Sequence, residues 1–271
     1  MPPRAPTILA LDFDGVICDG MREYFAAAWR AWRRLRPSVA PNPPPGLLEG
    51  FARVRPLIES GWEMPLVIHA LLSGASADDL LGSWRPAPLL AQLGLTREDV
   101  AAAVDRVRDA WIAADEADWL DHHRFYPGVV EKLGRLAGGP TRSVVVTTKE
   151  GRFARKLLAR QGLELGAGNV LGKEVGQPKP AILRELIDAG PPTASLWFVE
   201  DRLEALAAVK RTPGLDGVEL FLASWGYNTE RDREAARRDD RIAPLSLEQF
   251  AGDFAGWRAG ADDRPRTPPL R

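Results

Sequence analysis

Residues 8–20 read ILALDFDGVICDG, and this stretch decides how the rest of the sequence is interpreted. The apolar run of residues 7–11 ends in a polar loop, as is typical of a fully buried parallel strand. Asp12 and Asp14 follow it at once. Ionised carboxylates at the end of a buried strand cost free energy unless another charge compensates them. The stretch therefore predicts a buried strand with a charged site at its carboxyl end.

The pattern changes to a helical period after Met21. Phe25, Trp29 and Trp32 fall on one face, and Asp19 is positioned to cap the helix that carries them. The proline-rich stretch at 41–46 ends that helix, and residues 47–124 have mostly helical patterns. We therefore expect a helical insert over residues 20–124.

Beyond the insert, apolar runs alternate with amphipathic segments. The sequence predicts strands at 143–148, 195–201 and 218–227, and helices from Pro127, over 151–160, over 178–189 and from Arg202. Such alternation predicts an α/β fold with a doubly wound, Rossmann-like parallel sheet. This core comprises residues 1–19 and 125–250. Residues 251–271, rich in proline and charge toward their end, are predicted to form a frayed C-terminal tail.

The composition excludes several classes of protein. The 271 residues include 36 basic and 37 acidic side chains, so no net field attracts nucleic acid or an anionic membrane. No apolar run reaches the roughly 18 residues of a membrane span, and the short N-terminal one is a poor signal peptide. The single cysteine, Cys18, is assigned to packing and favours a reducing compartment. We expect a soluble cytoplasmic protein; its oligomeric state is not predicted.

Other polar and aromatic groups are interpreted as structural. We assign His122 and His123 to the surface or a linker, and the charged run at 231–241 to a solvated surface segment. Six of the nine tryptophans lie in the insert, where packing in a helical core is favoured over a platform that stacks on a base or sugar.

Three predicted strands end in chemically useful side chains, and in a parallel sheet such ends face a common crevice. The group comprises Asp12, Asp14, Thr147 or Thr148, Glu200 and Asp201. Neighbouring carboxylates repel one another and raise each other's pKa unless a cation neutralises them. Mg²⁺ is the expected cation, because it prefers oxygen ligands and is held by few carboxylates. It leaves one aspartate able to attack an electrophile.

The order of these residues resembles the haloacid dehalogenase superfamily, in its phosphatase branch with a helical cap. Its DxD motif is matched by Asp12-Phe13-Asp14, and its strand ending in Thr or Ser by Val144-Val145-Val146-Thr147. Its lysine motif is matched by Lys179-Pro180, and its strand ending in acidic residues by Trp197-Phe198-Val199-Glu200-Asp201. The resemblance covers residues 7–20 and 126–227, and it identifies the insert at 20–124 as the cap.

The resemblance implies a Mg²⁺-dependent phosphatase that hydrolyses a small phosphorylated metabolite. Asp12 is then the nucleophile that forms a phosphoaspartyl intermediate, and Asp14 protonates the leaving alcohol and later activates water. Thr147 and Lys179 contact the transferring phosphoryl group, with Thr148 as a neighbouring candidate. Asp201 holds Mg²⁺ with the Asp12 carboxylate and the backbone carbonyl of Asp14.

Two matches leave a choice open. Glu200 replaces the glycine that many relatives have before the last aspartate, and it either binds the metal or orients its waters. Thr147 is preferred to Thr148 because it directly follows the apolar run.

Other activities on the same fold stay possible at this point. A metal-independent haloacid dehalogenase has no use for a second acid at Asp14. A phosphomutase would isomerise a sugar phosphate without releasing phosphate. A catalytically silent protein would bind a phosphorylated ligand without turning it over.

Overall fold

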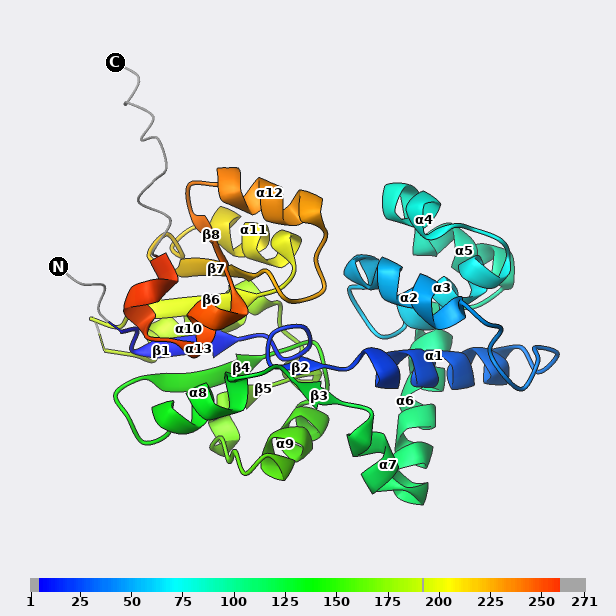
Figure 1. Cartoon of the computed structure of the whole chain (residues 1–271), viewed down its shortest axis with the longest axis horizontal. Coiled ribbons are helices and arrows are strands. Elements are labelled where there is room, and N and C mark those ends of the chain that lie inside the picture. The colour runs from blue at the N-terminus through cyan, green and yellow to red at the C-terminus, as the bar shows by residue number, and fades with distance from the viewer. Residues whose placement is uncertain (1–4, 192, 259–271) are drawn as a thin grey trace, which may run out of the picture. The chain divides into compact units, whose positions relative to one another are not determined.

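The computed structural model describes residues 5–191 and 193–258, which form two compact units. One unit consists of the described residues up to Asp19 together with those from Phe125 onward. The other consists of Gly20–Arg124. The predicted α/β fold class is confirmed in the first unit, which we call the core unit; the second is the helical unit (Figure 1).

A six-stranded parallel sheet organises the described part of the core unit, in the order β5-β4-β1-β6-β7-β8. The strands are β1 (Ile8–Leu11), β4 (Arg142–Val146), β5 (Val170–Leu171), β6 (Leu196–Glu200), β7 (Glu219–Ala223) and β8 (Ile242–Leu245). Two short strands, β2 (Cys18–Asp19) and β3 (Arg124–Phe125), pair separately. The first strand is central, so the chain winds outward from β1 in both directions.

Helices connect these strands, as a parallel sheet requires, and one more follows the last strand. They are α8 (Val129–Leu136), α9 (Gly151–Arg160), α10 (Lys179–Asp188), α11 (Leu203–Arg211), α12 (Glu230–Arg238) and α13 (Leu247–Ala251). Three 3₁₀ turns, η2 (Ala167–Asn169), η3 (Lys173–Val175) and η4 (Phe254–Arg258), complete the described elements. The helix predicted over 151–160 is confirmed with those bounds.

Alternate side chains of each strand enter two separate apolar layers. Ile8 pairs with Leu196 and Ala10 with Phe198, and all four enter the layer covered by residues of α10, α11 and α12. The intervening positions of β1, β6 and β7 face the opposite layer, because successive strand residues point to opposite faces. Leu9, Leu11 and Val199 are fully buried there. Burial on both faces explains why these strands read as continuous apolar runs.

The opposite layer corrects the prediction for the C-terminal tail. Trp257 is 1% exposed, and its ring centroid lies 5.2 Å from that of Phe221 and 5.4 Å from that of Trp197. Lys132 Nζ donates a 2.6 Å hydrogen bond to the carbonyl of Gly252, which ties this segment to α8. Residues 251–258 are therefore packed rather than frayed, because their aromatic side chains cover the sheet. The rest of the predicted tail, 259–271, lies outside the described residues.

The helical unit contains no strand before Arg124 in its described residues. Its helices are α1 (Met21–Leu35), α2 (Leu47–Val54), α3 (Glu63–Leu72), α4 (Ala77–Ser83), α5 (Pro86–Leu93), α6 (Arg97–Ala114) and α7 (Glu116–Asp121), with the 3₁₀ turn η1 (Arg55–Leu57) after α2. Capping boxes at Ser76 and Thr96 begin α4 and α6.

Tryptophan packing in the helical unit agrees with the sequence interpretation. Trp29, Trp32, Trp111 and Trp119 are all buried.

A buried ion pair also stabilises the helical unit. Glu23 is completely buried, and Arg108 donates to both of its carboxylate oxygens, at 2.7 and 3.0 Å. The bidentate pair joins α1 to α6 and compensates a charge that would otherwise be costly to bury.

Two local predictions are wrong. Asp19 does not cap α1: the capping residue is Gly20, and the Asp19 carboxylate accepts a 2.6 Å hydrogen bond from the Tyr227 hydroxyl. His123 is buried rather than on the surface, with its ring 4.6 Å from that of Trp119. The prediction that the charged run at 231–241 is a solvated surface segment is confirmed: it forms most of α12, after a capping box at Thr229, and only Ala236 in it is buried.

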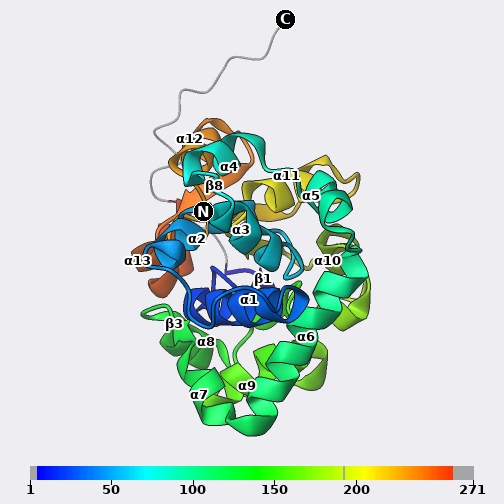
Figure 2. The same cartoon turned by 90° about the vertical axis from the view of Figure 1, so that its right-hand side faces the viewer.

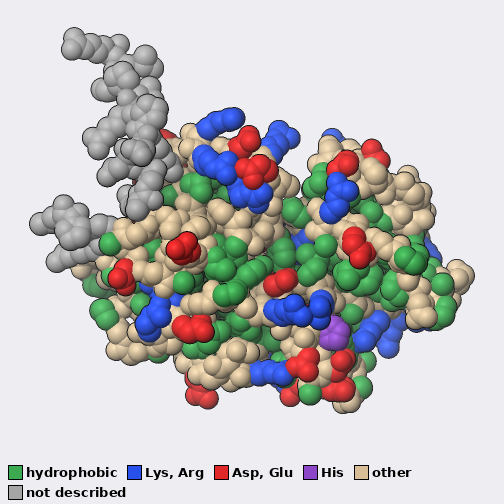
Figure 3. Space-filling model, viewed as in Figure 1, with side chains coloured by type: hydrophobic (Ala, Val, Ile, Leu, Met, Phe, Trp, Pro, Cys, Tyr) green, Lys and Arg blue, Asp and Glu red, His purple; other side chains and the backbone are tan. Residues whose placement is uncertain are grey.

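Among residues 5–191 and 193–258, no helix combines the length and apolar character needed to cross a bilayer. Basic and acidic side chains are interspersed over the visible surface of each unit (Figure 3).

Replacing Trp257 with alanine tests the packed C-terminal segment. The Trp257→Ala change removes a buried ring from the core unit and should lower its free energy of unfolding by about 3–5 kcal/mol. Leu72→Ala, at a site 38% exposed, is the control and should change stability by less than about 0.5 kcal/mol. Chemical denaturation followed by circular dichroism measures both. Equal, small effects would mean that residues 254–258 do not contribute to the core.

Candidate active site

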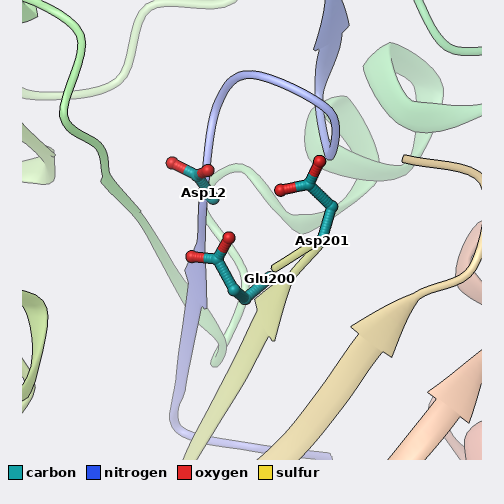
Figure 4. Close-up of side chains that lie close together, drawn as sticks. All are labelled: Asp12, Glu200 and Asp201. Carbon is teal, nitrogen blue, oxygen red and sulfur yellow. The ribbon is translucent and has the colours of Figure 1, made fainter. Parts of the chain in front are cut away.

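Three buried carboxylates meet at the carboxyl ends of the two central strands β1 and β6. Asp12 directly follows β1, Glu200 ends β6 and Asp201 follows it. One oxygen of each lies within 4.8 Å of the others, and the three residues are 7%, 0% and 1% exposed (Figure 4). The alignment of Leu11 with Val199 in the parallel register places the next residues, Asp12 and Glu200, side by side.

Lys179 supplies the positive charge beside this cluster. Its Nζ lies 3.0 Å from Asp12 Oδ1 and 2.5 Å from Glu200 Oε2, with the lysine side chain 14% exposed. Lys179 is the first residue of α10, which Pro180 helps to begin. The other oxygen of Glu200 accepts a 3.1 Å hydrogen bond from the backbone N–H of Arg202. Both oxygens of Glu200 are thus engaged within the protein.

The protonation equilibria reflect this crowding. Burial raises the pKa of Asp12 to about 7, and the Glu200 carboxylate adds to the rise while Lys179 opposes it. Burial acts against the charged form of Lys179, but the carboxylates of Asp12 and Glu200 outweigh it and raise the lysine pKa. For Glu200, burial raises the pKa, but the Lys179 ammonium, together with hydrogen bonds to Asp201 and to the backbone of Arg202, outweighs burial and lowers it. The site therefore favours a charged Lys179 paired with an ionised Glu200. Of the carboxyl groups of Asp12 and Glu200, that of Asp12 takes up a proton more easily.

Two glycines make room for Asp201. Gly15 has a φ of +87°, and a Cβ there would lie 2.0 Å from Asp201 Oδ2. A Cβ at Gly226 would lie 2.3 Å from the Asp201 Cβ. The backbone N–H of Tyr227 donates a 2.6 Å hydrogen bond to Asp201 Oδ2. The DFDG turn and the loop after β7 therefore fix Asp201 from two sides.

Asp14 points to a second lysine that the sequence analysis did not select. Lys149 Nζ lies 3.2 Å from Asp14 Oδ1, and the lysine is 7% exposed. Its backbone N–H also donates a 3.1 Å hydrogen bond to Thr147 Oγ1. A signal was present in the sequence, because Lys149 follows the two threonines at the end of β4. Its importance depends on a side-chain direction that the sequence does not give.

The two candidate threonines differ in burial. Thr147 is 5% exposed at the end of β4, whereas Thr148 is exposed. Because Thr147 Oγ1 already accepts from Lys149, its hydroxyl hydrogen is available to a ligand oxygen. The structure thus brings together Asp12, Lys179, Glu200 and Asp201, places Asp14 with Lys149, and leaves Thr148 at the surface.

The acidic cluster fits a magnesium ion. Asp12 Oδ1 is buried and accepts no hydrogen bond from the described residues, although it lies near the Lys179 ammonium. All three groups are hard oxygen donors, the class that Mg²⁺ prefers. Since both Glu200 oxygens are already engaged, Asp12 and Asp201 are the better candidates for direct ligands, with Glu200 holding Lys179.

Comparison with known proteins finds similarity in structure but not in sequence. No protein-family model matches the chain, and no curated protein matches it. A haloacid dehalogenase-like hydrolase from Bacteroides fragilis aligns with a TM-score of 0.58 and 16% identity, over 91% of this chain and 100% of that one. A predicted phosphoglycolate phosphatase from Haemophilus somnus aligns with a TM-score of 0.59 and 16% identity, over 90% and 95%.

A third similar structure is named as a kinase and not as a hydrolase. Protein tyrosine kinase A of Mycobacterium tuberculosis aligns with a TM-score of 0.52 and 16% identity, over 95% of this chain and 99% of that one. The chain has the haloacid dehalogenase-like fold. At such identities the fold is shared, and the reaction must be argued from the site.

The raised pKa of Asp12 predicts how the metal-free protein responds to pH. The native state keeps a proton on Asp12 up to about pH 7, whereas the unfolded chain releases it near 3.8. The native state then binds more protons in this window, so the free energy of unfolding should fall as pH rises through it. Denaturation of the wild type and of Asp12→Asn in EDTA, from pH 4 to pH 8, measures the effect.

The variant isolates the contribution of Asp12, because its amide does not titrate. We expect a smaller loss of stability with rising pH in Asp12→Asn than in the wild type. Added Mg²⁺ should stabilise the wild type more at pH 8 than at pH 5, since metal and proton compete for one carboxylate. Parallel pH curves for the two proteins would contradict the assignment.

Proposed function

We propose that the protein is a Mg²⁺-dependent phosphatase that hydrolyses a small phosphomonoester. The observation that supports it most is the buried Asp12 carboxyl at the carboxyl end of the central strand β1. It forms an ion pair with Lys179, and Asp14 follows it two positions later in the sequence. This arrangement offers a nucleophile, a nearby charge for an anionic phosphoryl group and a second carboxyl able to exchange protons. The phosphatase-like names of several similar structures agree with it.

The reaction follows from these side chains in two displacements. A carboxylate oxygen of Asp12 attacks phosphorus, and the bond from phosphorus to the ester oxygen breaks as a phosphoaspartyl group forms. The Asp14 carboxyl gives its proton to the departing alkoxide, which leaves as an alcohol. The Asp14 carboxylate then takes a proton from a water molecule, whose oxygen attacks phosphorus and releases Asp12 and inorganic phosphate.

The surrounding groups stabilise charge during both steps. Mg²⁺, held by Asp12 and Asp201, supplies positive charge to the phosphoryl oxygens when bound. The Lys179 ammonium adds a second positive charge, and Glu200 keeps it in place. Thr147 donates its hydroxyl hydrogen to a phosphoryl oxygen, and the Lys149 ammonium holds the Asp14 carboxyl. The helical unit, in this proposal, is the cap that selects the leaving group.

The first test of this function is the release of phosphate by the purified protein. We expect release from a generic aryl phosphate and from members of a phosphomonoester panel with Mg²⁺, and none with EDTA. Asp12→Asn should lower turnover by at least about a thousandfold, because it removes the nucleophile. Asp188→Asn, at an exposed position, is the matched control and should retain activity. Wild-type turnover in Asp12→Asn would exclude the covalent mechanism.

The alternatives give different readouts in the same assay. A phosphomutase would isomerise a hexose phosphate without net release of phosphate. A dehalogenase would release halide from a haloacid in the presence of EDTA. A silent binding protein would bind phosphate and show no release across the panel.

The two threonines provide a matched pair for the second test. Thr147→Val removes the buried hydroxyl and should lower kcat/KM by about a hundredfold, because a donor to the transferring phosphoryl group is lost. Thr148→Val makes the same chemical change at an exposed position and should have little effect. Steady-state kinetics with one panel substrate measures both. A larger loss in Thr148→Val would transfer the phosphate contact to Thr148.

A further inference from the structure

The helical unit contains a concave groove between α1 and α6, two helices that pack against each other and cross at a large angle (Figure 2). Its volume is about 410 Å³, within the range of small-molecule sites. The groove is lined by Arg30, Arg33, Arg34, Val107, Ala110 and Trp111. Half of the lining residues are therefore arginines from a single helix, and the others are mainly apolar residues of α6.

The three arginines carry positive charge that the described protein does not neutralise. Among residues 5–191 and 193–258, none of their guanidinium groups forms an ion pair with a carboxylate or donates a hydrogen bond. Arg33 Nε is buried without an acceptor. A buried donor without an acceptor is costly, and elsewhere in this unit Arg108 is fully paired with Glu23. The groove thus presents unused donors, whereas the same two helices hold Arg108 in a bidentate pair with Glu23.

The spacing of the arginines suits a single anionic group. Arg33 and Arg34 lie three and four residues after Arg30, so each is about 5–6 Å from Arg30 at Cβ, on either side of it, and all three side chains line the same groove. Guanidinium groups bind phosphate oxygens through paired N–H donors. Two or three of these groups can therefore contact one phosphoryl group at once.

The apolar side of the groove favours a planar ring. The Arg30 guanidinium lies 3.7 Å from the centroid of the Trp111 ring, and Trp111 is itself buried. The outer face of Arg30 is a flat, cationic surface above an aromatic support, and guanidinium planes of this kind stack on nucleobases. Val107 and Ala110 extend this surface with small apolar side chains.

We propose that this groove is a binding site for a phosphorylated small molecule with a planar ring, of the mononucleotide class. The phosphoryl group contacts Arg33 and Arg34, and the ring lies on Arg30 over Trp111. The inference concerns the helical unit alone, and it does not depend on the reaction proposed for the core unit.

Calorimetric titration of the full-length protein tests the site. Adenosine 5′-monophosphate, adenosine and inorganic phosphate are titrated in EDTA, which suppresses turnover. The wild type should bind the mononucleotide more tightly than either fragment, because only the whole molecule reaches both the arginines and the stacking surface. The double change Arg33→Gln/Arg34→Gln should weaken mononucleotide binding at least about tenfold, as expected for lost charged hydrogen bonds.

Two further variants keep the result interpretable. Arg106→Gln changes an exposed arginine of α6 outside the groove and should bind like the wild type. Arg34→Gln alone, at an exposed position, should still lower the affinity severalfold if the double variant does not fold.

Four results would overturn the proposal. They are no mononucleotide binding to the wild type, unchanged affinity in both groove variants, an equal loss in Arg106→Gln, and inorganic phosphate binding as tightly as the mononucleotide. The same holds if a single-stranded oligonucleotide binds much more tightly per site, because the groove would then belong to a polymer surface.

Discussion

The ammonium group of Lys179 lies between two buried carboxylates, 3.0 Å from Asp12 and 2.5 Å from Glu200. The parallel register of β1 and β6 places these acids side by side, so like charges are adjacent before any ligand arrives. Without a cation the edge of the sheet would hold two carboxylates that repel each other in a poorly solvated place. Lys179 allows Glu200 to stay ionised and keeps Asp12 close to the point where it gains or loses a proton. The phosphoryl chemistry that we propose for this site depends on that balance.

The position of Lys179 in its helix shows that the site constrains the surrounding fold. A cation in the first turn of an α-helix opposes the helix dipole, and α10 nevertheless begins with Lys179. Pro178 precedes the helix and Pro180 lies in its first turn, so the chain begins α10 at a fixed point. The unfavourable dipole term is offset by two carboxylates at short range. A similar constraint acts at the DFDG turn, where Gly15 leaves room for the Asp201 carboxylate.

Sequence reasoning was most successful where one residue pattern determined one structural feature. Buried parallel strands read as apolar runs, so β1, β4, β6 and β7 could be found directly, as could the acids after β1 and at the end of β6. The short strands β5 and β8 were missed: β5 has two residues, and Pro244 interrupts the pattern of β8. The contact of Lys149 with Asp14 was missed because it depends on the direction of a side chain after β4. The packing of Trp257 was missed because the charged residues beyond it dominated the composition of the segment.

The two short strands β2 and β3 affect how freely the helical unit can change. They pair with each other, so the chain leaves the core at Asp19 and returns at Phe125 from neighbouring positions. Because its two ends are adjacent, a segment of any length can join these points without changing the core, as a turn would. Insertions are tolerated at such places. Gly20–Arg124 can therefore diverge in sequence without displacing the acids at the ends of β1 and β6. The same geometry explains why the core has recognisable sequence motifs, whereas the insert has none that we recognise.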